Sequence, residues 1–243
     1  MHKEFKQLNH RPFPLPKSPW ILTQVWNDLL FMHWPVKVED IRKLVPDSLE
    51  IDTFKGEAWV SIIPFYVTGM RARYLPPIPM LNQYTELNVR TYVRYQGIPG
   101  IYFFSLDADH PLAVLGAKLS TGLPYRQARM KYNKNNNQIN FYSNRIKNNK
   151  MIDVNYYPES GPTNPLPGTL DNWLLERYCM YSFIGENMFR GDIHHDKWAV
   201  ASVQASVSRN TMFELLEGNQ NSPPLMHYCK QKQFFFFPLK KLK

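Results

Sequence analysis

The sequence predicts an α+β protein built mainly from an antiparallel β-sheet, with a few peripheral helices outside the sheet. Aromatic residues make up 14% of the chain, with 15 Phe, 14 Tyr and 6 Trp, and such residues favour strands over a helical bundle. Successive strand-like segments are joined by short turns, which connect antiparallel neighbours. The chain lacks βαβ alternation and a glycine-rich phosphate loop, which argues against a nucleotide-binding fold.

In the N-terminal part, apolar runs with few polar breaks predict strands at 21–33, 49–54 and 57–67. Lys37–Val45 predicts a helix, because apolar residues recur at helical spacing, acidic residues occupy the first turn and a proline follows. Lys55-Gly56 is a hairpin signal between the second and third strands. Arg71–Pro79 contains three prolines and therefore predicts a loop.

The central part of the chain predicts two hairpins with a helix between them. Tyr84–Asp107 is typical of two strands around the turn Gly97-Ile98-Pro99-Gly100. A short helix is expected at Pro111–Ser120, where leucines recur at helical spacing. The second hairpin spans Arg126–Arg145, and its five-residue tip at 133–137 is rich in Asn, which tolerates positive φ.

The C-terminal part begins with a proline-rich stretch, Pro158–Gly168, which is a candidate domain boundary. After it we expect helices at 170–177 and 210–217, and strands at 178–183, 198–207, 226–228 and 234–237. Dividing the chain at the proline-rich stretch would leave sheet edges open. We therefore expect a single domain over residues 1–243, in which about 18 N-terminal residues and the C-terminal tail are peripheral.

The formal net charge of +9 is concentrated in the Lys131–Lys150 region and in a tail with three lysines. A nucleic-acid-binding face interleaves basic and aromatic residues, and the sequence lacks that pattern, so we expect no nucleic-acid partner. No run approaches the roughly 18 apolar residues of a membrane span, and the N-terminus lacks the apolar core of a signal peptide. We therefore expect a cytoplasmic protein without a membrane partner, with Cys179 and Cys229 reduced.

Polar residues at alternate positions of one predicted strand mark the candidate site. Glu86, Asn88 and Arg90 share one face of that strand, because side chains two residues apart point the same way. The carboxylate and the guanidinium could hold a polar ligand, or they could form an ion pair that stabilises the sheet. The alternating pattern leaves both interpretations open.

Six fragments spread over most of the chain resemble the YqjF-like family of uncharacterised bacterial proteins. They are His33-Trp34-Pro35-Val36, Trp59-Val60, Glu86-Leu87-Asn88-Val89-Arg90-Thr91-Tyr92-Val93, Ser105-Leu106-Asp107-Ala108, Leu123-Pro124-Tyr125 and Glu176-Arg177-Tyr178. The resemblance implies the acetoacetate decarboxylase-like fold, a closed, mainly antiparallel β barrel or cone around a central cavity.

In the decarboxylases, a strand glutamate precedes a short helix that leads into Gly-x-Pro-Lys-Lys, and the first lysine forms a Schiff base with the keto substrate. Glu86 matches the glutamate, and Gly122-Leu123-Pro124 matches Gly-x-Pro. By this resemblance Tyr125 falls on the Schiff-base position and Arg126 on its cationic neighbour. A phenol and a protonated guanidinium cannot form an imine, and Lys118, the nearest preceding amine, does not match the motif.

Three other features have both functional and structural interpretations. Tyr178 belongs to a fragment of the resemblance, so it is expected either to reach the cavity or to form a buried hydrogen-bonded pair. His194-His195 suggests a metal site, but adjacent strand residues diverge and a third ligand is missing at any recognisable spacing. We expect no metal and place His195 at the cavity. Phe234–Phe237 alternates between core and outer face or marks a subunit interface, which leaves a homo-oligomer open.

The sequence thus favours a cavity protein that binds a small organic anion or polar metabolite without a cofactor. The candidate ligand contacts are Arg90, Arg126, Tyr178 and His195. The alternative is a lyase or isomerase acting on a carbonyl acid, in which Glu86 and Tyr125 are the catalytic acid/base pair. A third interpretation, an oligomeric scaffold without a ligand, requires a cavity filled by side chains.

Overall fold

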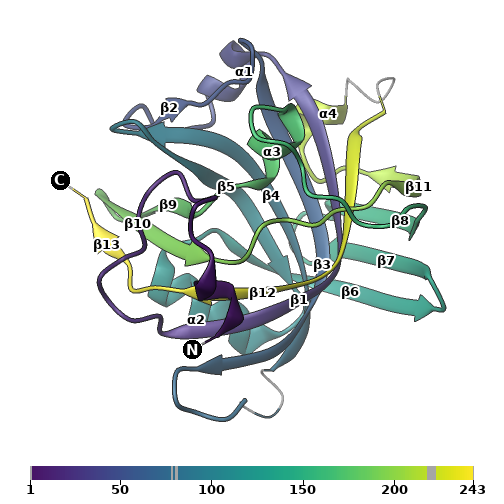
Figure 1. Cartoon of the computed structure of the whole chain (residues 1–243). Coiled ribbons are helices and arrows are strands. Elements are labelled where there is room, and N and C mark those ends of the chain that lie inside the picture. Colours follow the sequence, from purple (N-terminus) through teal and green to yellow (C-terminus); the bar gives the residue numbers. More distant parts are fainter. Residues whose placement is uncertain (1, 78, 80–81, 218–222, 243) are drawn as a thin grey trace.

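A ring of seven strands forms the centre of the computed structural model, which describes residues 2–77, 79, 82–217 and 223–242 (Figure 1). The strands follow the order β5, β9, β10, β12, β1, β3 and β4, and the sheet closes because β4 pairs with β5. Their bounds are Leu22–Val36 (β1), Ala58–Ala72 (β3), Gln83–Tyr95 (β4), Ile98–Ala108 (β5), Cys179–Ile184 (β9), Asn187–His194 (β10) and Leu225–Phe236 (β12). Within the ring, only β5 and β9 pair in parallel. The predicted closed, mainly antiparallel sheet is confirmed.

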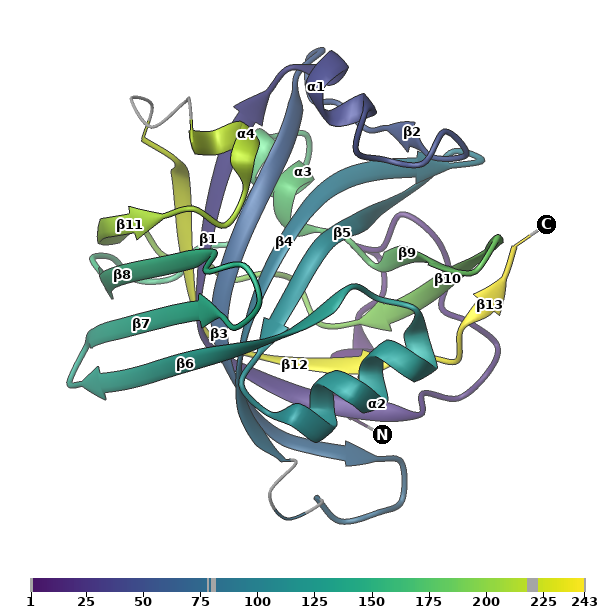
Figure 2. The same ribbon diagram turned by 180° about the vertical axis from the view of Figure 1, so that it is seen from behind.

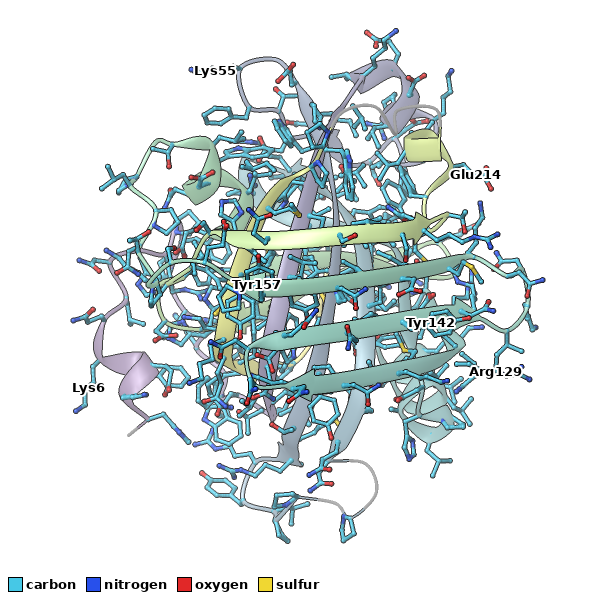
Figure 3. The ribbon with its side chains drawn as sticks, turned by 90° about the vertical axis from the view of Figure 1, so that its right-hand side faces the viewer. Lys6, Lys55, Arg129, Tyr142, Tyr157 and Glu214 are labelled. Carbon is cyan, nitrogen blue, oxygen red and sulfur yellow. The ribbon has the colours of Figure 1, made fainter. Side chains whose placement is uncertain are left out.

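A second, four-stranded sheet covers one side of the ring (Figures 2 and 3). Its strands are β6 (Tyr125–Asn135), β7 (Gln138–Arg145), β8 (Met151–Pro158) and β11 (Val203–Asn210), and β6 connects to the ring by parallel pairing with β5. Figure 3 shows these strands crossing in front of the ring, with Tyr142, Tyr157 and Arg129 on the outer side. Phe141 on the inner side belongs to the same hydrophobic core as Leu30 of the ring.

Short helices and short strands complete the described part of the chain. They are the 3₁₀ helix η1 (Lys3–Lys6), α1 (Val38–Arg42), α2 (Pro111–Thr121), α3 (Leu170–Leu175), α4 (Glu214–Glu217), β2 (Glu50–Ile51) and β13 (Lys240–Lys241). In Figures 1 and 2, α2 lies at one end of the ring and α3 near the other. None of the described helices has the length and apolar character to cross a membrane.

Alternating side chains give the ring two apolar sides. On β1, Leu30 and Met32 belong to the core shared with the second sheet, whereas Leu29 and Phe31 belong to a separate core inside the ring. This is the period of two that a strand imposes on its side chains. The interior of the ring therefore has its own apolar wall.

Several predicted boundaries need correction. The first central hairpin turns at Gln96-Gly97, with φ of 48° and 76°, because two consecutive positive φ values match the twist of the flanking strands. The next hairpin turns within two residues, since Asn135 already pairs with Gln138. The two predicted final strands are one strand, β12, which pairs with β1 through its polar middle.

The N-terminal segment, which the sequence predicts to be peripheral, lies against the outside of β10 and β12 (Figure 1). The rings of Phe5 and Trp20 pack on Phe235 with centroid distances of 4.8 Å and 5.5 Å. Arg11 is buried and donates a hydrogen bond of 2.8 Å to the carbonyl oxygen of Ile193. The outer face of the phenylalanine run is thus covered by the chain itself, and the single-domain organisation stays a prediction.

Candidate ligand pocket inside the ring

A pocket of about 310 Å³ lies inside the ring, with side chains of α2 and of α3 in its wall. Strands β1, β4, β5, β10 and β12 supply most of the rest of the wall, and single residues of β3, β6 and β9 and of connecting segments complete it, so residues far apart in the sequence meet there. Most lining side chains are apolar. Strand β4 contributes a row of polar groups, and the other polar groups of the wall come from several different elements.

Strand β4 presents an open row of polar side chains, Glu86, Asn88 and Arg90, to the pocket. The intervening residues Leu87 and Val89 belong to the core under the second sheet, so the alternation predicted from the sequence is confirmed. A strand rises about 3.3 Å per residue, which separates the Cα atoms of Glu86 and Arg90 by about 13 Å. The two charged groups therefore stand at different depths of one pocket, and they do not form an ion pair in the part of the chain that the structure describes.

Gly122 directs the chain from α2 into β6. It caps the helix with φ of 66°, and a Cβ atom at this position would lie 2.5 Å from the carbonyl oxygen of Phe183, so only glycine fits. Three residues later, Tyr125 enters the pocket, and its hydroxyl donates to Oε2 of Glu86 at 3.4 Å. The Gly-x-Pro turn thus brings Tyr125 to Glu86.

Glu86 is a buried carboxyl group with 3% of its surface exposed. Burial raises its pKa to about 8, although hydrogen bonds from Tyr125, Asn88 and Tyr84 lower the pKa in part. Burial and the Glu86 charge also hold the pKa of Tyr125 well above its ordinary value. Near neutral pH both groups therefore carry their protons, and Glu86 can donate a hydrogen bond.

Arg90 and Arg177 both line the pocket, but their charges are compensated differently. Arg177 belongs to a closed cluster with Asp52 and Arg94, in which the two guanidinium groups approach the Asp52 carboxylate at 2.6 Å and 2.7 Å. Arg90 donates a long hydrogen bond of 3.5 Å to the carbonyl oxygen of Leu174. Among the described residues, Arg90 has no carboxylate within ion-pair distance and its Nε has no hydrogen-bond partner.

Asn88 adds an unpaired acceptor to the pocket wall. Its side chain is 1% exposed, and its Oδ1 has no hydrogen-bond partner within the described ranges. Buried polar atoms normally have a partner, because an unpaired one costs about 1–3 kcal/mol. The row on β4 therefore offers a ligand one acceptor, one cationic donor and one carboxylic acid.

His195 and Tyr178 form a stacked pair, with ring centroids 4.5 Å apart. His195 lines the pocket, and burial lowers its pKa well below the ordinary value, so the imidazole is neutral. Tyr178 is buried outside the pocket lining; it donates a hydrogen bond to Glu176, and the Arg11 guanidinium lies over its ring at 4.5 Å. Tyr178 thus packs against the His195 ring and does not itself line the pocket.

Arg126 and Lys118 lie away from the pocket, among the exposed residues of β6 and α2. Arg126 follows Tyr125 in a regular strand, and adjacent strand residues face opposite ways. The structure therefore places Tyr125 inside and Arg126 outside. A ligand contact by Arg126 does not follow from this placement.

Sequence reasoning missed several polar groups of the wall. The Gln24 side chain donates to the Tyr84 hydroxyl at 3.0 Å and accepts from the Trp26 indole at 2.8 Å, which fixes the hydrogen bonds at the α2 end. Tyr84 could have been found, since it precedes Glu86 by two residues on the same strand face. Gln24 has no such signal, because its place depends on the neighbouring strands.

A comparison with solved structures identifies the fold as that of acetoacetate decarboxylase-like enzymes. The enduracididine biosynthesis enzyme MppR complexed with pyruvate superposes with a TM-score of 0.65 at 9% identity, over 96% of this chain and 93% of that one. Acetoacetate decarboxylase from Legionella pneumophila gives a TM-score of 0.65 at 13% identity, over 99% of this chain and 94% of the enzyme. At such identities the similarity shows the fold alone.

The sequence comparisons then give the family. Residues 23–233 match DUF2071, a family described as uncharacterized conserved proteins. The chain is also 46% identical over 244 residues to the uncharacterized protein YqjF of Bacillus subtilis (strain 168), with 99% of each chain covered. The chain belongs to the DUF2071 family.

Proposed function

We propose that this protein binds a small organic anion in the pocket inside the ring, with Arg90 as the group that receives the negative charge. The observation that carries this proposal is the charge state of the pocket. Glu86, Tyr125 and His195 are neutral near pH 7, and Asp52 compensates Arg177. Arg90 therefore leaves the wall with about one positive charge, which a monoanion balances.

The neighbouring groups fit the same ligand. The protonated Glu86 can donate to a carbonyl or hydroxyl oxygen, and Asn88 Oδ1 can accept from a hydroxyl group. A related fold that holds pyruvate in MppR supports an organic acid as the ligand class. Binding without imine chemistry is consistent with Tyr125 at the position where the decarboxylases carry a lysine.

Isothermal titration calorimetry with matched carboxylates and carboxamides tests this proposal. Octanoate is expected to bind, and octanamide, which lacks the charge, is expected to bind at least about 10-fold more weakly. Arg90→Gln should remove most of the preference for octanoate over octanamide. Arg126→Gln removes the same charge at a position outside the pocket and should leave that preference unchanged. Equal affinity for acid and amide in the unmodified protein would contradict the proposal.

A second candidate function is general acid/base catalysis on a carbonyl acid by Glu86 and Tyr125. The observation that favours it is the 3.4 Å contact between the two oxygens, together with a pKa of about 8 for Glu86, which lies near physiological pH. Proton NMR of 2-oxobutyrate in D₂O would detect exchange of the protons beside the carbonyl group. Exchange above the buffer rate that disappears in Glu86→Gln supports catalysis, and exchange at the buffer rate argues against it.

A further inference from the structure

We infer that the ligand is an amphipathic monocarboxylate, an acid that carries an aliphatic chain or an aromatic ring, bound with its carboxylate deep at Arg90 and its apolar part toward α2. This inference rests on the proposed anion binding and adds the chemical class of the anion. Three observations carry it: the composition of the wall, the depth of the pocket and the inner face of α2.

Apart from the polar row on β4 and the hydrogen-bonded groups beside it, the wall between Arg90 and α2 is apolar. Phe103 faces Arg90 across strands β4 and β5, and the Phe31 ring lies 6.0 Å from the Arg90 guanidinium. At the other end, Leu22 and Phe236 face each other across β1 and β12, and both line the pocket. A short polar acid would leave this apolar surface exposed to water. A hydrocarbon chain covers it, and this burial stabilises the complex by about 25 cal/mol per Å² of apolar surface.

The size of the pocket sets the size of the acid. An apolar cavity of about 150 Å³ holds a benzene molecule, so a pocket of about 310 Å³ accommodates about 12 non-hydrogen atoms. Octanoate has about this size. The Cα separation of about 13 Å between Glu86 and Arg90 also exceeds the length of a two- or three-carbon acid.

Helix α2 covers the apolar end of the pocket with small residues. Ala113, Gly116, Ala117 and Ser120 line the pocket at helical spacing; Gly116 and Ser120 are also exposed, and a Cβ atom built on Gly116 meets nothing within 4 Å. Leu112 also lines the pocket although 57% of it is exposed, which places an opening of the pocket at α2. These small residues at the opening leave room for the tail of the ligand.

The charge arrangement excludes a dicarboxylate. A second carboxylate at the α2 end would lie among Leu22, Phe236 and the polar end of Tyr84, close to Glu86. Arg177 lies at the other end, over the same Tyr92 ring as Arg90, and the Asp52 carboxylate 2.6 Å from its Nη1 compensates its charge. One end of the ligand is therefore charged and the other end apolar.

Isothermal titration calorimetry over a series of acids tests the inference, with acetate, pyruvate, octanoate and the dicarboxylate suberate as probes. Octanoate is expected to bind at least about 100-fold more tightly than acetate, because each buried methylene adds about fourfold. Suberate should bind at least about 10-fold more weakly than octanoate. Fluorescence of Trp26 and Trp198, which line the pocket, gives an independent readout of occupancy.

Two variants of α2 locate the tail. Gly116→Leu places a side chain in the pocket and should weaken octanoate at least about 10-fold while acetate changes little. Lys118→Leu introduces the same side chain on the same helix but outside the pocket lining, and it should leave both affinities unchanged. Circular dichroism confirms that both variants fold.

The outcomes separate the two proposals. Binding of pyruvate or acetate as tightly as octanoate would overturn the amphipathic ligand class and leave anion binding intact. Unchanged octanoate binding in folded Gly116→Leu would overturn the placement of the tail. If none of the four acids binds, the proposed anion binding fails, and the inference fails with it.

Discussion

The closed cluster (Asp52, Arg94, Arg177) and the open row (Glu86, Asn88, Arg90) hold the same kinds of charged group inside one barrel, yet their charges are compensated differently. In the closed cluster, guanidinium groups lie 2.6 Å and 2.7 Å from one carboxylate. In the open row, Glu86 accepts a 3.4 Å hydrogen bond from a phenol, and Arg90 donates a 3.5 Å bond to a backbone carbonyl. The guanidinium groups of the closed cluster thus face a carboxylate, whereas Arg90 in the open row has no such partner among the described residues.

This difference shows that burial alone does not identify a functional group. Asp52 and Glu86 are each 3% exposed, but Asp52 lies against two guanidinium groups, whereas burial raises the pKa of Glu86 to about 8 and hydrogen bonds from its neutral partners lower it only in part. Unfavourable burial of polar groups is retained where it serves binding or chemistry. We therefore expect changes in the closed cluster to alter stability and changes in the open row to alter ligand binding and the pH dependence of stability.

The largest expected effect is a pH-dependent loss of stability that Glu86 causes. Its pKa is about 8 in the folded protein and 4.5 in the unfolded chain, so between these values only the folded state keeps the proton. The free energy of unfolding then falls as the pH rises through this window, by at most about 5 kcal/mol, and Glu86 contributes no further change above pH 8.

Urea unfolding of the unmodified protein and of Glu86→Gln, compared from below pH 4.5 to above pH 8, measures this contribution. The difference between the two proteins should favour the variant increasingly toward alkaline pH. A constant difference across the window would show that Glu86 titrates at its ordinary pKa.

The next effect concerns the closed cluster. Asp52→Asn leaves the Arg177 guanidinium, which is 3% exposed, without a compensating charge, and it should lower the free energy of unfolding by about 3–5 kcal/mol. Chemical denaturation at neutral pH is the measurement. Asp40→Asn is a matched control, because Asp40 pairs with Lys43 on the surface at 3.8 Å, and its loss should cost less than about 1 kcal/mol. If Asp52→Asn also lowers the free energy of unfolding by less than about 1 kcal/mol, the closed cluster does not differ from a surface ion pair.

A smaller effect is expected when Arg90 is replaced. Arg90→Gln removes a buried charge that lacks a carboxylate partner among the described residues, so its stability should stay within about 1 kcal/mol of the unmodified protein or rise. Arg177→Gln, which removes a guanidinium from the closed cluster, should lower the free energy of unfolding by about 3 kcal/mol or more. Thermal unfolding of the two variants checks this prediction. Equal losses of stability in Arg90→Gln and Arg177→Gln would contradict the difference between the open row and the closed cluster.

The smallest expected effect is the absence of an imine. Tyr125 cannot form one, and Lys118, the nearest amine that precedes it in the sequence, is exposed and outside the pocket lining. Borohydride added together with acetoacetate should therefore trap no adduct, and the protein should show no acetoacetate decarboxylase activity. Mass spectrometry of the treated protein is the measurement. A stable adduct on Lys118 that is lost in Lys118→Ala would overturn this prediction.

The sequence predicted the parts of the site that follow from local periodicity. The period of two put Glu86, Asn88 and Arg90 on one strand face, and the Gly-x-Pro resemblance put Tyr125 near Glu86; the structure brings all four to one pocket. Local periodicity also required Tyr125 and Arg126 to face opposite ways, but it could not tell which of them faces inward. That choice depends on how β6 leaves Gly122.

Contacts between distant segments could not be predicted in the same way. The Arg177 side chain reaches Asp52 across 125 residues, and Gln24 reaches Tyr84 across 60. These pairs exist because the sheet closes and because α3 lies beside the Arg90 end of the pocket. The sequence left open an ion pair between Glu86 and Arg90 because strand spacing fixes the face of a residue but says little about which charges meet.

Direct titration of Glu86 tests the central claim, that this carboxyl group is held protonated in the pocket that also contains the Arg90 guanidinium. Carbon-13 NMR of protein labelled at the glutamate side-chain carboxyl carbons reports each ionisation separately, and Glu86→Gln identifies the signal. The account predicts that the Glu86 signal titrates with a midpoint near pH 8, well above the ordinary glutamate pKa of 4.5. A midpoint below about pH 5.5, within the usual spread of glutamate pKa values, would contradict it.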